Sequence, residues 1–138
     1  TIIDDTYNAN PASMKAAIET LKTISGEGQS IAVLGDMLEL GDKSAAFHEE
    51  IGRFAAETGI SKLYCYGDLA AHMVKGAVDG GLSSANAFSG TKEEIGKAVV
   101  QAASKQPVRI LVKGSRSMKM EEVIGFIKTF SPKEGPGN

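Results

Sequence analysis

Short apolar runs alternate along this chain with longer stretches whose apolar residues recur at helical spacing, and no other feature constrains the fold as much. Five apolar runs are predicted strands, at 2–3, 30–34, 62–66, 87–88 and 108–112. Five longer stretches are predicted helices, at 11–25, 43–58, 68–78, 91–104 and 118–130. This alternation predicts an α/β fold, an open and mostly parallel sheet of five or six strands with helices on both faces.

Capping residues mark where two of the helices begin. Asn10 can accept a hydrogen bond from a free N–H of the first helical turn. Pro11 suits the first helical position, because it has no N–H to leave unpaired. Thr91 and Glu94 have the spacing of a capping box. These residues predict helix starts near 11 and 91.

Composition and charge narrow the class of protein. With 138 residues, 42% of them hydrophobic, the chain is one globular domain or a piece of a larger protein. A net charge of −2 gives no indication of nucleic acid or of an anionic membrane as a partner, and no apolar run approaches the roughly 20 residues that span a bilayer. The single cysteine, Cys65, lies in an apolar run. We therefore expect a buried thiol and a protein of the reducing cytoplasm. We also expect the protein to be a monomer.

The two ends of the chain lead to separate expectations. Thr1 already lies in the first predicted strand, so we expect residues 1–130 to be a domain cut from a longer protein. Residues 131–138 are rich in proline, glycine and polar side chains. Such a segment cannot bury enough apolar surface to pack, and we predict a disordered tail.

Three loops follow the first, second and last predicted strands, at 4–10, 35–41 and 113–117. In a parallel sheet the carboxyl ends of the strands meet at one edge, and ligands of open α/β sheets bind there. The first loop brings Asp5, Tyr7, Asn8 and Asn10 to this edge. The plain alternative is a strand–turn–helix joint with ordinary caps.

The last loop carries the most chemistry. Gly114 would let the backbone approach a ligand closely, and Ser115 or Ser117 can cap the following helix, whose N-terminus favours a carboxylate or phosphate. Lys113 and Arg116 add positive charge. This pattern predicts an anion-binding loop. The alternative is a capped helix beside two solvated cations.

The middle loop offers the two carboxylates Asp36 and Glu39, with His48 on the next predicted helix. Such groups could transfer protons, hold a cation or bind an amine. The alternative for His48 is a half-buried histidine whose hydrogen bonds are satisfied. Because histidines and cysteines do not cluster, we expect no metal site.

Two nucleotide-binding motifs are missing from the sequence. It contains neither a G-x-x-x-x-G-K-[ST] phosphate loop nor a G-x-G-x-x-G turn. A chain of this kind can contact a nucleotide, but it has no familiar means of gripping a triphosphate.

Three blocks stand in a fixed order: Asp4-Asp5-Thr6-Tyr7-Asn8-Ala9-Asn10-Pro11, then Val33-Leu34-Gly35-Asp36-Met37-Leu38-Glu39-Leu40-Gly41 with His48 and Gly52, then Leu111-Val112-Lys113-Gly114-Ser115-Arg116 with Met120-Glu121. Together they resemble the C-terminal domain of the Mur ligases, over residues 1 to about 128. The resemblance implies a Rossmann-like sheet. It also implies that an N-terminal domain and a central ATP-binding domain, both absent from this chain, complete the enzyme.

The blocks are most similar to those members that add D-alanyl-D-alanine to UDP-N-acetylmuramoyl-tripeptide in peptidoglycan synthesis. The resemblance implies ATP and Mg²⁺ as cofactors, gripped mainly by the central domain, and an acyl-phosphate intermediate. It implies that Asp5, Tyr7, Asn8 and Asn10 face the nucleotide and the interdomain cleft. Lys113, Ser115 and Arg116 would lie toward the dipeptide, and Asp36 and His48 match the pattern without an assigned role. No residue is assigned a catalytic role, and the isolated domain should be inactive.

Three alternatives remain open at this point. The chain could be the equivalent domain of a Mur ligase that adds another amino acid. It could be a stand-alone α/β binding module. A flavodoxin-like or receiver domain would need a phosphate-binding or phospho-acceptor loop, and only Asp4, Asp5 and Asp68 suggest one.

Overall fold

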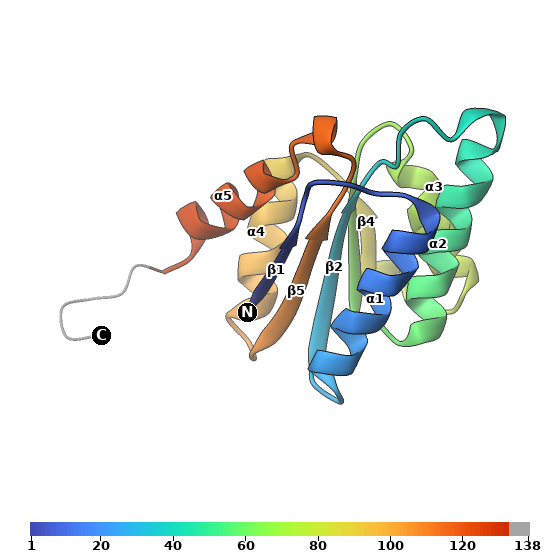
Figure 1. Ribbon diagram of the computed structural model, residues 1–138. Helices are drawn as coiled ribbons and strands as arrows, with labels where there is room; N and C mark the ends of the chain where they lie inside the picture. Colours follow the sequence, from blue (N-terminus) through green and yellow to red (C-terminus); the bar gives the residue numbers. More distant parts are fainter. Residues whose placement is uncertain (133–138) are drawn as a thin grey trace.

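A single parallel sheet organises the structure, a computed structural model that describes residues 1–132 (Figure 1). Its strands are β1 (Ile2–Asp5), β2 (Gln29–Gly35), β3 (Lys62–Tyr66), β4 (Ala87–Ser89) and β5 (Val108–Lys113). They lie in the order β1-β5-β2-β3-β4, and every pairing is parallel. The predicted fold class is confirmed, with five strands in the part of the chain that the structure describes.

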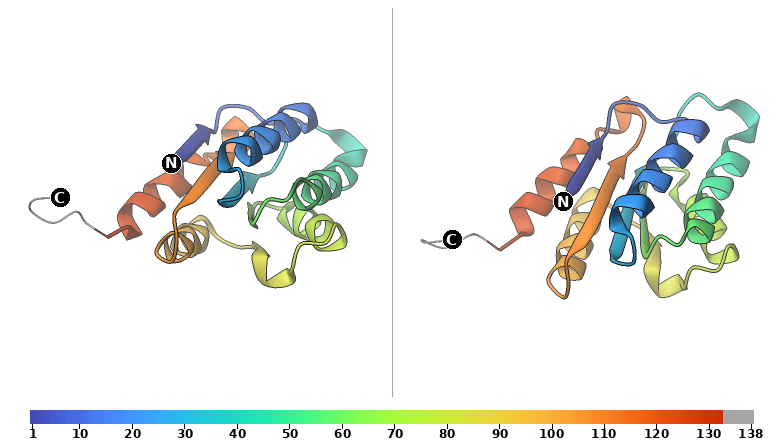
Figure 2. Two further views of the ribbon diagram at one scale, coloured as in Figure 1. Left: turned by 90° about the horizontal axis from the view of Figure 1, so that it is seen from below. Right: turned by 60° about the horizontal axis from the view of Figure 1, so that its bottom comes forward.

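Helices cover both faces of this sheet, as predicted. They are α1 (Pro11–Ser25), α2 (Ser44–Thr58), α3 (Ala70–Asp79), α4 (Lys92–Ala103) and α5 (Glu121–Phe130). Figures 1 and 2 show α1, α2 and α3 on one face and α4 and α5 on the other. The side chains of β2 explain the arrangement, because Ala32 and Leu34 join the core under α1 to α3, whereas Ile31 and Val33 join the core under α4 and α5. A strand covered on both faces must be apolar throughout.

The predicted caps form at α1 and α4. The Asn10 side chain accepts a hydrogen bond from the Ser13 N–H at 2.9 Å, and Pro11 occupies the first turn. The Thr91 hydroxyl accepts from the Glu94 N–H at 3.1 Å, and the Glu94 carboxylate accepts from the Thr91 N–H. Both helix starts were therefore predictable from their capping residues.

Two other helix starts differ from the prediction. Helix α3 begins at Ala70 rather than at 68. Helix α5 begins at Glu121 rather than at 118, because residues 116–118 form a 3₁₀ turn and Lys119 takes a left-handed conformation, with φ of 52°. A left-handed residue cannot continue an α-helix.

Helices α2 and α3 pack at two glycines. A Cβ at Gly52 would overlap the Met73 carbonyl group, and a Cβ at Gly76 would overlap the Glu49 carbonyl group. Gly52 is buried, whereas the larger side chains of Phe47 and Phe54 on the same helix are only partly buried. The backbones approach so closely because neither glycine has a side chain.

Cys65 is completely buried in the core under α1 to α3, as predicted. Burial raises the pKa of its thiol, and the negative charge of Asp36 raises it further. An inaccessible thiol that stays protonated is not a nucleophile.

The last described residues continue the hydrogen bonding of α5. The Ser131 N–H and hydroxyl both donate to the Ile127 carbonyl. Most of the segment predicted to be a disordered tail, residues 133–138, lies outside the described residues. Within residues 1–132, every helix is too short or too polar to cross a membrane.

Candidate functional site

The three predicted loops meet at the carboxyl edge of the sheet, which is the upper end in Figure 1. Strand register explains this, because Lys113 at the end of β5 pairs with Asp5 of β1 on one side and with Leu34 of β2 on the other. Between the loops lies a hollow of about 380 Å³, hereafter the edge hollow. It is lined by Tyr7, Asn8, Ala9, Leu38, Glu39, Ser115, Arg116 and Ser117.

Lys113 is the best-anchored polar residue of this edge. Its side chain is only 3% exposed, and its Nζ donates hydrogen bonds to Asp5 Oδ2 at 2.8 Å and to the Asn8 carbonyl at 2.7 Å. Solvation of Lys113, the alternative left open by the sequence, is therefore wrong. The ammonium group instead ties the first loop to the last strand across more than 100 residues of chain.

This contact leaves the tip of the first loop facing outward. Tyr7 is 79% exposed, and Asn8 is exposed with its carbonyl bound to Lys113. Asn10 uses its side-chain oxygen as the cap of α1. Tyr7 and Asn8 thus remain available to a ligand or another domain, whereas Asn10 mainly orients the helix.

The last loop differs from the predicted anion-binding loop in two ways. Neither serine caps α5, because the Ser115 hydroxyl instead accepts a hydrogen bond from the Leu38 N–H at 2.9 Å. Gly114 does not make room for a ligand, since a Cβ there would lie 2.6 Å from Met120 Cγ and 3.1 Å from Gly35 Cα. The small residue instead lets two loops of the edge approach each other.

The first turn of α5 is also acidic, which disfavours an anion there. Arg116 Nη1 donates to Glu121 Oε2 at 3.0 Å, so its charge is already compensated. The pKa of Glu121 is lowered, first by a hydrogen bond from the backbone N–H of Glu121 to its own carboxylate and then by the nearby Arg116 guanidinium. Arg116 nevertheless remains exposed, and its guanidinium can turn toward a ligand in the edge hollow.

Asp36 proves to be a buried residue that holds the middle loop. Its carboxylate accepts a hydrogen bond from the Leu69 N–H at 3.1 Å, and its carbonyl accepts one from the Ser115 N–H. Gly67 packs against this carboxylate in a left-handed conformation, with φ of 122°. Burial is the largest cause that raises the pKa of Asp36 above its ordinary 3.8.

His48 holds the same loop from α2. It is fully buried, Nε2 accepts a hydrogen bond from the Met37 N–H at 3.0 Å, and Nδ1 lies 2.6 Å from the Ser44 carbonyl. Because Nε2 is an acceptor, the proton of the neutral ring is on Nδ1. The alternative of a satisfied histidine is thus correct, although the residue is more deeply buried than predicted.

Replacing His48 with alanine should lower the free energy of unfolding by about 2 kcal/mol, because the buried Met37 N–H loses its acceptor and a cavity forms. Urea denaturation of the purified chain measures this change. The matched control is His72→Ala on α3, whose ring makes no hydrogen bond among residues 1–132 and should cost less than about 0.5 kcal/mol. Equal effects of the two substitutions would contradict this account of His48.

Replacing Asp36 with asparagine should give a stability difference that depends on pH. A carboxyl group whose pKa is raised by folding stabilises the folded state while it is protonated, and this contribution is lost as the pH rises through the folded pKa. Asparagine has the same shape and keeps an acceptor for the Leu69 N–H. The variant should therefore gain stability relative to the parent as the pH rises from the ordinary pKa of 3.8 through the raised pKa of the folded state. Urea denaturation of both proteins at several pH values measures the difference in free energy of unfolding, variant minus parent. This difference should increase with pH, and a constant or decreasing difference would contradict the prediction.

Comparison with known proteins places this geometry in a family. The model of the family described as "Mur ligase, glutamate ligase domain" matches residues 1–116. The chain belongs to the Mur ligase family. The resemblance seen in the three blocks is thereby confirmed, and all three blocks contribute to the carboxyl edge.

Individual Mur ligases share both sequence and fold with the chain. It is 42% identical over 123 residues to UDP-N-acetylmuramoyl-tripeptide–D-alanyl-D-alanine ligase of Bacillus subtilis, an alignment that covers 89% of this chain and 27% of that protein. A crystal structure of MurF from Acinetobacter baumannii superimposes with a TM-score of 0.79 at 33% identity, covering 92% and 28% of the two chains. The structure of MurF ligase from Thermotoga maritima in complex with ADP superimposes with a TM-score of 0.73 at 29% identity, covering 93% of this chain and 28% of that one. The chain thus spans about a quarter of the length of these relatives.

Proposed function

We propose that this chain is the C-terminal domain of an ATP-dependent ligase that joins D-alanyl-D-alanine to UDP-N-acetylmuramoyl-tripeptide. The similarity to proteins named for that reaction supports the substrates. The single structural observation that carries the proposal is the anchored edge, in which Lys113 fixes the first loop while Tyr7 and Arg116 face outward. Such an edge suits a domain that closes over another one.

The contribution of this domain is to position groups and exclude water. In the reaction, ATP activates the terminal carboxylate of the tripeptide as an acyl phosphate, which the amine of the dipeptide attacks. Closure of a domain over a hydrolysable intermediate keeps water away and orients the amine. We propose that Tyr7 and Asn8 contact the nucleotide side of the cleft, where Asp5 and Asn10 fix the loop that carries them. Ser115 and Arg116 would lie toward the dipeptide, with Lys113 holding the two sides together.

We propose that ATP and Mg²⁺ are gripped mainly by the part of the enzyme outside this chain. Residues 1–132 contain no group of three or more His, Cys, Asp or Glu residues arranged to hold a metal ion. The sequence also lacks a phosphate loop. This domain would then contact only part of the nucleotide. We further propose that the complete enzyme is a cytoplasmic monomer of cell-wall synthesis, needed for cell shape and division.

A second candidate is a ligase of the same family that adds a different amino acid. The description of the matching family model as a glutamate ligase domain favours this alternative. The two candidates differ in the amine that is accepted, so a panel of amines tests the first candidate against the second.

The test uses the complete protein that contains this chain. With ATP, Mg²⁺ and UDP-N-acetylmuramoyl-tripeptide, we expect product only when D-alanyl-D-alanine is added. D-glutamate, L-lysine and meso-diaminopimelate serve as competing amines. The chain of 138 residues alone should give no product in the same assay, and turnover by it would contradict the proposal.

A further inference from the structure

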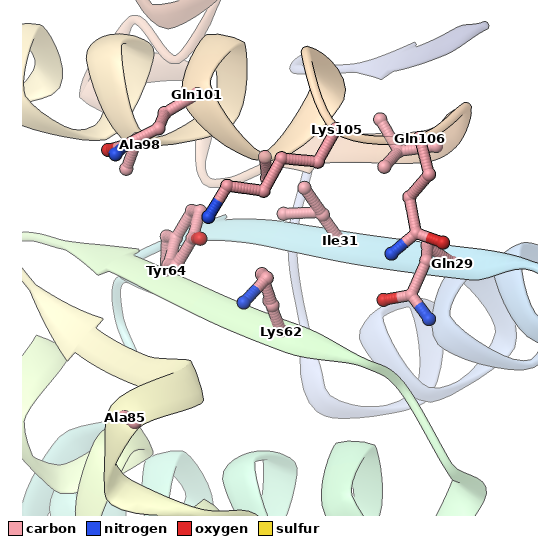
Figure 3. Close-up of a pocket in the computed structure, with 11 residues that line it drawn as sticks. Gln29, Ile31, Lys62, Tyr64, Ala85, Ala98, Gln101, Lys105 and Gln106 are labelled. Carbon is pink, nitrogen blue, oxygen red and sulfur yellow. The ribbon is translucent and has the colours of Figure 1, made fainter.

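A second polar hollow lies at the opposite end of the sheet from the candidate site. Figure 3 shows this hollow in close-up. It has a volume of about 350 Å³, and it is bordered by the amino ends of β2, β3 and β5 and by the last turns of α4. We refer to it as the amino-end hollow. Its lining residues are Gln29, Ile31, Lys62, Tyr64, Ala85, Ala98, Gln101, Ala102, Lys105, Gln106 and Val108.

The lining of the amino-end hollow is positively charged. It contains two lysines and three glutamines but no carboxylate. Lys62 Nζ donates to the neutral side chain of Asn86 at 2.9 Å, and Lys105 forms no ion pair with any residue between 1 and 132. Lys15, Lys75, Lys92, Lys97 and Lys113 each have a carboxylate partner. Neither lysine of this hollow has one among the described residues, so the hollow has a local excess of positive charge.

The hydroxyl of Tyr64 adds a hydrogen-bond donor between the two lysines. In Figure 3 the Lys105 side chain extends toward this hydroxyl from beyond α4, and Lys62 enters the same space from β3. The Tyr64 ring is nearly buried and packs on Phe88, with ring centroids 4.6 Å apart. Burial raises the pKa of Tyr64, so the hydroxyl keeps its proton and can donate it to an anionic oxygen.

The hollow also offers apolar surface beside these polar groups. Ile31 and Val108 come from the sheet, and Ala98 and Ala102 come from α4. The three glutamines surround them with amide donors and acceptors. A ligand that fits both parts has an anionic head and a small organic body with hydroxyl or carbonyl groups.

We propose that the amino-end hollow is a binding site for a small organic anion. Its phosphate or carboxylate head lies between Lys62 and Lys105, within reach of the Tyr64 hydroxyl. The glutamines bind its polar substituents. This site is separate from the carboxyl edge, and the proposal does not depend on which amine the ligase adds.

Titration of the isotopically labelled chain by NMR tests the proposal. Glycerol phosphate and citrate are the probes, added at constant ionic strength, and sodium chloride is the blank. We expect saturable shifts of the backbone amides of Gln29, Lys62, Gln101 and Lys105 with at least one probe. The probe that saturates identifies the head group as phosphate or carboxylate. Shifts that do not saturate, or that spread over all lysines of the surface, would overturn the proposal.

Two substitutions make the test specific. Lys62→Met and Lys105→Met should each weaken the binding about tenfold, the effect of losing one charge-assisted hydrogen bond. The control is Lys128→Met on α5, an exposed lysine that does not line the hollow and should leave the affinity unchanged. Because Lys105 is exposed, its replacement should not disturb the fold, and the amide spectrum of the unliganded variant should match that of the parent away from residue 105. An unchanged affinity in Lys105→Met would refute the site.

Discussion

Replacement of Lys113 with methionine should lower the free energy of unfolding of this chain by about 3 kcal/mol. Methionine fills a similar volume but cannot donate to Asp5 or to the Asn8 carbonyl. Removing one partner of a buried ion pair typically costs about 3–5 kcal/mol, and the lower end applies because the Asp5 side chain is 41% exposed and can regain water. Urea denaturation measures the loss.

The same substitution should also slow ligation in the complete enzyme by about tenfold or more, equivalent to roughly 1.4 kcal/mol of transition-state stabilisation. Asp5→Asn removes the charge at the other end of the contact and should act in the same direction. In a double-mutant cycle the two effects should be strongly non-additive, because each variant breaks the same contact. Independent effects, or near-parental stability and rate in both variants, would show that this ion pair does not organise the edge.

Replacement of Gly52 with alanine should destabilise the chain by about 3 kcal/mol or more. The new Cβ would overlap the carbonyl group of Met73, and backbone atoms cannot move aside as the end of a flexible side chain can. Helices α2 and α3 would have to separate, which opens the core around His48 and loosens the middle loop. Thermal or urea denaturation of the purified chain measures this effect.

Gly125 provides the matched control for this prediction. It is also a helical glycine, on α5, but no atom lies within 4 Å of the position of its missing Cβ. Gly125→Ala should therefore stabilise the chain by roughly 0.5–1 kcal/mol, because alanine loses less backbone entropy in a helix. The two substitutions should have opposite signs. A mild or stabilising effect at Gly52 would contradict the close packing of α2 on α3.

The sequence predicts the elements of this fold better than their contacts. Strand and helix ranges follow from periodicity, and the caps at Asn10 and Thr91 follow from local chemistry. These signals depend on residues a few positions apart. The gathering of the three loops at one edge follows as well, because all parallel strands end on the same side.

The contacts within the candidate site depend on strand order, which periodicity does not reveal. The pairing of β1 with β5 brings Asp5 beside Lys113, and without that order Lys113 is simply a cation in a polar loop. The Ser115 hydroxyl is a plausible cap for the next helix until the position of Leu38 is known. The packing role of Gly52 and Gly76 cannot be predicted from the sequence for the same reason. Gly52 on α2 lies against the backbone of α3, and Gly76 on α3 lies against the backbone of α2.

His48 and Asp36 show how a matching motif can have a structural explanation. Both residues bind backbone N–H groups and hold the middle loop between α2 and the loop that precedes α3. The exposed groups of the edge hollow, above all Tyr7 and Arg116, are then the ones free to meet substrate. Residues of the first kind should affect stability and residues of the second kind should affect ligation.

The most direct test of the proposed function is amine-dependent ligation by the complete protein that contains this chain. The complete protein is incubated with ATP, Mg²⁺, UDP-N-acetylmuramoyl-tripeptide and an equimolar mixture of amines. The product is then separated, and its mass is determined by mass spectrometry. We expect a single product, heavier than the tripeptide substrate by one D-alanyl-D-alanine less one water. A product that carries a single amino acid instead, or no product with any amine, would contradict the proposed function.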